Sequence, residues 1–354
     1  MNQAGSRNRH ICPVLLTLLL CWSLSACGRN PDATGTLNLS TTAFGPQQLG
    51  VVVNDADPSS RQIAEYYINR RGIPAGNVIH VRFKPGNRIM RPEEFREIKD
   101  EVDRQTPAAV QAYALTWTVP YRVGCMSITT AFAAGFDADF CALGCEPTSQ
   151  SPYYNSSSRR PYDDFGWRPA IMLAGMHTRD VEALIDRGIA ADGSKPSGTA
   201  YLLSTTDRQR NTRARFYPGI RLLQSDRFRI EIIHGNELRR RDDVMFYFTG
   251  LVRVAGLDTN RFLPGAIADH LTSAGGQLTG NSQMSSLRWL EAGATGSYGT
   301  VAEPCNFVDK FPRPNLVIDS YLDGETLIES YWKSVAWPGQ GVFIGEPLAT
   351  PFPP

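Results

Sequence analysis

Short apolar runs alternate with amphipathic stretches along most of the chain. The β-branched run at 48–53 has the pattern of a buried strand, and the next stretch places Ile63, Tyr66 and Tyr67 on one face of a helix. Asp57 followed by Pro58 is typical of an N-cap with proline at the first helical position. Further strand-like runs lie at 78–81, 110–119, 170–174, 200–204, 228–233, 244–248, 296–301 and 342–344, and helical patterns at 92–102, 180–189, 211–224, 284–292 and 327–335.

Strands that alternate with helices of this length are typical of βαβ units. The sequence therefore predicts an α/β fold with a mostly parallel sheet covered by helices. Residues 137–168 interrupt the pattern with a loop-rich insertion that contains many Cys, Pro, Ser and Tyr residues. We expect a single α/β domain over residues 47–354 that carries this insertion.

The N-terminal segment has the parts of a secretory signal. Arg7 and Arg9 supply a positive start, and an apolar run follows at 11–24. The sequence Leu-Ser-Ala-Cys that ends at Cys27 resembles the bacterial lipobox, in which the cysteine is acylated and becomes the first residue of the mature protein. Gly28 after this cysteine is similar to lipoproteins directed to the outer membrane. An ordinary signal peptide followed by a chance cysteine is the alternative.

The lipobox resemblance implies that residues 1–26 are removed as a lipoprotein signal peptide and that Cys27 is the lipidation site. Two or more acyl chains would anchor the protein stably in a lipid bilayer. We therefore expect a cell-envelope protein held in the outer membrane and facing the periplasm. Residues 27–46, rich in Gly, Thr, Ser and Asn, are expected to be a flexible tether.

Composition is that of an ordinary globular protein, with 42% hydrophobic and 20% charged residues. Loss of Arg7 and Arg9 with the signal changes the formal charge from +1 to about −1, so no basic field would attract nucleic acid. Removal of 26 residues from 354 leaves 328, enough for a substantial core. We expect neither a nucleic-acid partner nor a cofactor.

Four cysteines remain in the predicted domain: Cys125, Cys141, Cys145 and Cys305. An exported protein meets oxidising conditions, which favours disulfides, but four cysteines allow three pairings and the sequence does not choose among them. Cys141 and Cys145 are close enough to form a small loop, which would leave Cys125 to pair with Cys305 or to stay free. A zinc site at the first three is the rival interpretation, but no histidine lies at ligand spacing, so no metal is predicted.

Polar residues follow several of the predicted strands, where open parallel sheets gather their ligands. Asp55 and Asp57 follow the first strand, while Asp269 and Glu303 follow later ones. Asp57 is explained as an N-cap. Asp55 is less easily explained, and a cation or ligand site that joins it to Asp269 or Glu303 is a further hypothesis.

The chain resembles an uncharacterised bacterial family of predicted exported proteins. The resemblance lies in Val53-Asn54-Asp55 and in the segments 263–273, 289–299, 303–306 and 337–341. The C-terminal half is more remotely similar to the three-layer, caspase-like fold of gingipain-type cysteine peptidases. The shared points include Glu-Ala-Gly-Ala before a Gly-rich strand and a closing Gly-Glu-Pro-Leu-Ala at 345–349, which resembles the Gly-Asp-Pro motif of those enzymes.

The chain departs from these peptidases where their catalytic residues lie. They carry His-Gly after one strand and cysteine after the next, whereas this chain has Thr249-Gly250 and then Asp269-His270. The resemblance therefore implies a degenerate caspase-like domain that binds a protein or peptide partner. In this interpretation Cys305 is disulfide-bonded, with Cys125 as its expected partner, and His270 is a buried polar residue.

A cysteine hydrolase is the alternative hypothesis. It would use Cys305 as the nucleophile and His270 as the base that forms its thiolate, with Asp269 or Glu303 orienting the imidazole. The order of His270 before Cys305 matches the caspase-like order. This hypothesis requires a free thiol at Cys305.

Overall fold

The computed structural model describes residues 44–353 except 143, 224, 226, 227 and 281. The predicted signal peptide, Cys27 and most of the predicted tether lie outside the described residues. Phe44, at the end of the predicted tether, is buried against the core. In the part of the chain that is described, no helix combines the length and the hydropathy needed to cross a bilayer.

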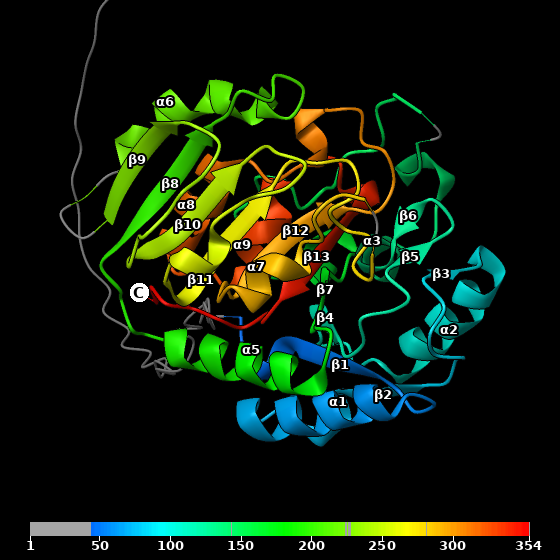
Figure 1. The fold of residues 1–354 in the computed structure, drawn as a ribbon. Coiled ribbons are helices and arrows are strands. Elements are labelled where there is room, and N and C mark those ends of the chain that lie inside the picture. Colours follow the sequence, from blue (N-terminus) through cyan, green and yellow to red (C-terminus); the bar gives the residue numbers. More distant parts are fainter. Residues whose placement is uncertain (1–43, 143, 224, 226–227, 281, 354) are drawn as a thin grey trace, which may run out of the picture. The chain divides into compact units, whose positions relative to one another are not determined.

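A ten-stranded sheet forms the centre of the described domain (Figure 1). The strand order is β2-β1-β4-β7-β13-β12-β11-β10-β8-β9, and neighbours are parallel except β12 and β13. The predicted α/β class and mostly parallel sheet are confirmed. The strands are β1 (Leu49–Asn54), β2 (Val78–Val81), β4 (Ala112–Leu115), β7 (Ala170–Met172), β8 (Gly198–Ser204), β9 (Phe228–His234), β10 (Val244–Thr249), β11 (Phe262–His270), β12 (Gly296–Thr300) and β13 (Gly341–Gly345).

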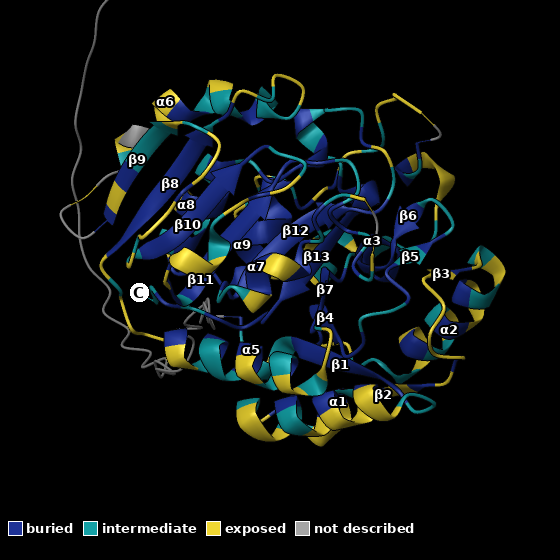
Figure 2. Ribbon diagram, in the orientation of Figure 1, coloured by how far each residue is buried: buried dark blue, intermediate teal, exposed yellow. Residues whose placement is uncertain are grey.

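Helices cover both faces of the sheet, so its inner strands are almost entirely buried, whereas the edge strands β2 and β9 are partly exposed (Figure 2). Successive residues of a strand point to opposite faces. Phe246 and Phe248 of β10 accordingly join the core beneath α1, α5, α8 and α9, whereas Tyr247 joins the core on the opposite face, where α7 lies. The helices are α1 (Pro58–Arg71), α2 (Pro92–Gln105), α3 (Ile128–Ala134), α4 (Pro161–Phe165), α5 (Thr178–Ala191), α6 (Tyr217–Ile220), α7 (Leu287–Glu291), α8 (Pro314–Leu322) and α9 (Leu327–Ser334).

Local signals placed most of these elements correctly, but several predicted elements are shorter than expected. The helix predicted at 284–292 is reduced to α7. The strand predicted at 110–119 is reduced to β4, after which the Trp117 indole donates to the Pro120 carbonyl as the chain turns away. The helix predicted at 211–224 is broken into a 3₁₀ segment, Asn211–Phe216, the single turn α6 and a second 3₁₀ turn. Pro218 and Gly219 in α6 are poor helix formers. A small second sheet, β3 (Ile89–Met90), β5 (Arg122–Val123) and β6 (Met126–Ser127), was not predicted.

The sheet consists of two parallel halves that run in opposite directions. β13 is parallel to β7 through Ile344 and Met172, and antiparallel to β12 over its whole length. The carboxyl ends of β1, β4 and β7 therefore lie along one boundary of the sheet, and those of β8, β10, β11 and β12 lie along the opposite boundary. The expectation that polar residues after all these strands gather at one edge is wrong, because it assumed a single strand direction.

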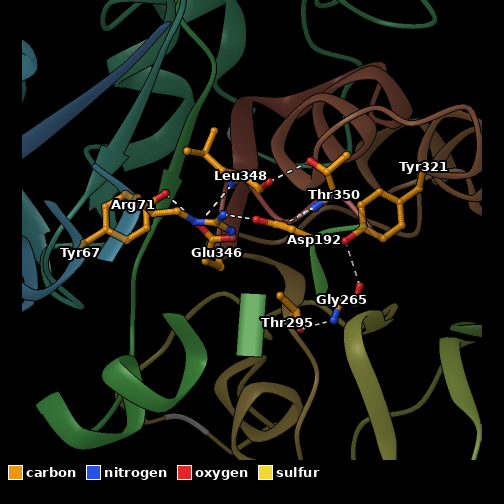
Figure 3. Close-up of polar contacts among 9 residues, drawn as sticks. All are labelled: Tyr67, Arg71, Asp192, Gly265, Thr295, Tyr321, Glu346, Leu348 and Thr350. Carbon is orange, nitrogen blue, oxygen red and sulfur yellow. Dashed lines mark hydrogen bonds and ion pairs between the residues drawn. The ribbon is translucent and has the colours of Figure 1, made fainter. Parts of the chain in front are cut away.

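Glu346, directly after β13, ties the C-terminal segment to α1 (Figure 3). Its side chain is fully buried and accepts hydrogen bonds from the Tyr67 hydroxyl (2.7 Å) and Arg71 Nε (3.0 Å). Arg71 also forms ion pairs with Glu346 and with Asp192 at the end of α5. Burial beside the Glu346 carboxylate raises the pKa of Tyr67 well above its ordinary value, so this phenol stays a donor.

The same cluster fixes the chain beyond Glu346. The backbone N–H of Thr350 donates to the Asp192 carboxylate (3.1 Å), and the Gly193 N–H donates to the Thr350 carbonyl (3.0 Å). Gly188 of α5 lets the helix approach closely, since a Cβ atom there would lie 2.5 Å from the Glu346 side chain. The Gly-Glu-Pro motif noted in the sequence therefore has a structural role in this chain.

Replacement of Glu346 by glutamine should lower the free energy of unfolding by about 3 kcal/mol, because it leaves Arg71 buried with only the half-exposed Asp192 as a carboxylate partner. Urea unfolding followed by circular dichroism measures this loss. The matched control is Asp186→Asn, which breaks the exposed ion pair between Asp186 and Arg70 on the same two helices. An equal loss in both variants would contradict a special role for Glu346.

Candidate functional site

His270 ends β11 and is buried, with 1% of its surface exposed. The Trp289 indole N–H donates to Nδ1 (2.9 Å), so the ring proton lies on Nε2, which donates to the Met284 carbonyl (3.2 Å). Burial lowers the pKa of His270 to about 3, and the charges of Arg213 and Arg210 act in the same direction. The imidazole is therefore neutral at physiological pH, with both nitrogens engaged.

Asp269 precedes His270 but faces the opposite side of the sheet, as the alternation of a strand requires. It forms a buried ion pair with Arg213 (2.6 Å), whose guanidinium also donates to the carbonyls of Thr249 (2.8 Å) and Pro312 (3.2 Å). Burial raises the pKa of Asp269, and the charge of Arg213 opposes that shift. Asp269 thus joins β11 to neighbouring loops and does not orient the imidazole of His270.

Cys305 is bonded to Cys145, and Cys125 is bonded to Cys141, with Cα–Cα distances of 5.1 and 5.4 Å. The small loop between Cys141 and Cys145 is not formed, and neither is the bridge from Cys125 to Cys305. The two disulfides instead attach the insertion at 137–168 to the chain beside β5 and β6 and to the loop after β12. Sequence spacing missed this pairing because it depends on where the insertion packs.

Glu303, the other residue expected to orient the imidazole, has a different partner. The Glu303 carboxylate accepts a hydrogen bond from the Cys305 backbone N–H (2.8 Å), and Cys305 has a left-handed φ of 54°. Glu303 therefore shapes the disulfide-bearing loop. Cys305 is in a disulfide, and both ring nitrogens of His270 are hydrogen-bonded to Trp289 and Met284. These two residues therefore offer neither a thiol nor a free imidazole nitrogen for nucleophilic catalysis.

Asp55 and Asp57 lie at the end of β1 and serve local structure. The Asp55 carboxylate contacts His80 Nδ1 (2.9 Å) on the neighbouring strand, and Asp57 caps α1 by accepting from the Ser59 N–H (2.9 Å), as predicted. The reversal at β13 separates Asp55 from Asp269, which ends a strand of the other half. Within the described residues, no group of three or more His, Cys, Asp and Glu side chains could hold a metal ion.

A cleft of about 910 Å³ lies beside His270 and is the strongest candidate for a binding site. The chain after β10 and the chain after β11 form two of its walls, and α7 supplies a third. Its apolar lining comes from buried Val254, Leu278 and Met284 and from Met176, which is 47% exposed. Charged residues of both signs also line the cleft: Arg253, Asp258, Arg288 and Glu291.

His270 contacts the backbone of Met284, which lines this cleft. Its Nε2 holds the carbonyl of Met284, whose N–H donates to the Val252 carbonyl (3.0 Å) and whose sulfur accepts from the Val254 N–H (3.5 Å). The imidazole thereby helps to fix the loop that lines the cleft. Sequence reasoning singled out His270 but missed the cleft, because its walls come from segments whose proximity depends on the sheet.

The full-length protein should contain no reactive thiol at Cys305. Peptide mapping of the non-reduced protein after alkylation with iodoacetamide is expected to recover the cross-linked pairs Cys125–Cys141 and Cys145–Cys305. A reduced and then alkylated sample controls for peptide recovery. An alkylated Cys305 in the non-reduced sample would contradict the disulfide and support the hydrolase hypothesis.

His270 should make the protein less stable in mild acid. The unfolded imidazole takes up a proton near pH 6.5, whereas the folded one does so only near pH 3, so stability falls as pH falls through this window. The contribution is about 2 kcal/mol between pH 7 and pH 5. Urea unfolding of His270→Gln should show a correspondingly weaker pH dependence, while His234→Gln, at an exposed position, should match the wild type. Equal pH dependence in all three proteins would refute the assignment.

Comparison with known protein families, curated proteins and solved structures finds no match to this chain. The resemblance to exported proteins and to caspase-like peptidases therefore stays an expectation from the sequence.

Proposed function

We propose that this protein is a lipid-anchored component of the bacterial cell envelope whose α/β domain binds a segment of a protein or peptide partner in the 910 Å³ cleft. The domain is a degenerate relative of the caspase-like fold that has kept a binding site without hydrolysis. Acylated Cys27 would hold it in the outer membrane, facing the periplasm.

The cleft is the observation that carries the binding proposal. Its volume is near the upper end of the range for ligand pockets, which suits several residues of an extended peptide. Val254, Leu278 and Met284 offer an apolar surface, and Met176 adds an exposed side chain at the cleft. A partner segment would bury an apolar side chain there and place charged neighbours against the lining charges of both signs.

The contacts of His270 and Cys305 favour binding over hydrolysis. The groups that a dyad would need, His270 and Cys305, are engaged with Trp289 and Cys145. Two disulfides are compatible with an oxidising compartment such as the periplasm. The lipobox sequence supports the anchor, and the strand-end motifs of the C-terminal half support the caspase-like relationship.

A phage-displayed library of random dodecapeptides, selected on the full-length protein in detergent, tests the proposal. Selected peptides should bind about tenfold more weakly to Met176→Glu, which places a charge at the cleft, and to Ala292→Trp, which fills it. Leu222→Glu is the matched control, because Leu222 is 89% exposed and lies outside the cleft. Equal binding to Ala292→Trp and the wild type would refute the cleft as the site.

A further inference from the structure

A second cavity, of about 680 Å³, shares no lining residue with the cleft. It lies between α2, the C-terminal end of α3 and the end of the insertion. Small residues leave the space open, and they include Ala133, Ala134, Gly135 and Gly166. The cavity therefore lies in the N-terminal half of the domain, whereas the cleft lies mainly in the other half.

Arg168 is the central feature of this cavity. Only 6% of the residue is exposed, and its Nε donates to the Val110 carbonyl (2.9 Å). The Tyr162 ring stacks on the guanidinium, whose carbon lies 3.2 Å from the ring centroid. Stacking and the Nε hydrogen bond hold the planar group in one orientation at the cavity wall.

The charge of Arg168 is incompletely balanced by the protein. Among the described residues the nearest carboxylate is Asp103, 4.0 Å from a terminal nitrogen, which is beyond hydrogen-bond distance. Both Asp103 oxygens already accept from Lys99 Nζ, each at 2.6 Å. The guanidinium also interacts with the Tyr113 hydroxyl. Because it carries five N–H groups, it keeps donor capacity for a ligand.

The rest of the lining also favours an anion with a flat apolar body. Arg96 and Lys99 add two positive charges against those of Asp100 and Asp103, so with Arg168 the lining has a net charge of +1. Aromatic surface comes from Phe136 and Tyr162, both of which are partly exposed. Carboxylates match the fork of an arginine, and aromatic rings provide stacking surfaces for a planar ligand.

We propose that this cavity binds a small aromatic carboxylate whose carboxyl group pairs with Arg168 and whose ring packs against the aromatic walls. The ligand site is independent of the peptide cleft.

Isothermal titration of the full-length protein in detergent with benzoate tests this assignment. Benzoate should bind, whereas benzamide, which lacks the charge, and acetate, which lacks the ring, should bind at least about tenfold more weakly. Equal binding of benzamide would contradict recognition of the carboxylate charge by Arg168. Equal binding of acetate would contradict packing of the ring against the aromatic walls. No binding of benzoate would overturn it.

Two variants locate the site. Arg168→Lys keeps the charge but loses the fork, and is expected to weaken benzoate binding about tenfold. Ala134→Phe fills the cavity without removing a charge and should abolish binding, which covers the case in which the Arg168 variant does not fold. Arg160→Met, at a 67% exposed side chain of the insertion outside the cavity, should bind as the wild type does. Unchanged binding in folded Ala134→Phe would place benzoate elsewhere and refute the site.

Discussion

The fold depends on the position of β13, which comes last of the strands along the chain but lies in the middle of the sheet. It is the link between two parallel halves of opposite direction, and its neighbours β7 and β12 are not paired with each other. The buried contacts of Glu346 with Tyr67 and Arg71 hold the chain directly after this strand. A single charged cluster thus connects the C-terminal end of β13 to α1.

Much of this fold could be predicted from the sequence, because the deciding signals are local. Asp57 and Pro58 begin α1, and Gly72 ends it in the left-handed conformation. Helix α3 was missed for a physical reason: six of its seven residues are buried, so it shows no amphipathic period. Strand direction at β13 and the disulfide pairing depend on contacts between distant residues, and no local pattern reports them.

Some features of the candidate site could likewise be predicted from the sequence, and others could not. Strand alternation alone would have placed Asp269 and His270 on opposite faces, so the orienting role given to Asp269 could have been rejected from the sequence. The Trp289 partner of His270 could not have been inferred, because it comes from a helix folded onto the sheet. The buried arginines 168 and 213 also gave no signal, since arginine in a sequence is normally interpreted as solvated.

The central place of β13 has a consequence for how the domain folds as the chain is synthesised. Residue 344 pairs with residue 172, so this part of the sheet cannot close until the chain has emerged well beyond position 340. A chain cut between 301 and 340 would leave β7 and β12 with open edges, which are templates for aggregation. Folding of this domain therefore discriminates against incomplete chains, because only a chain that includes β13 can remove both edges.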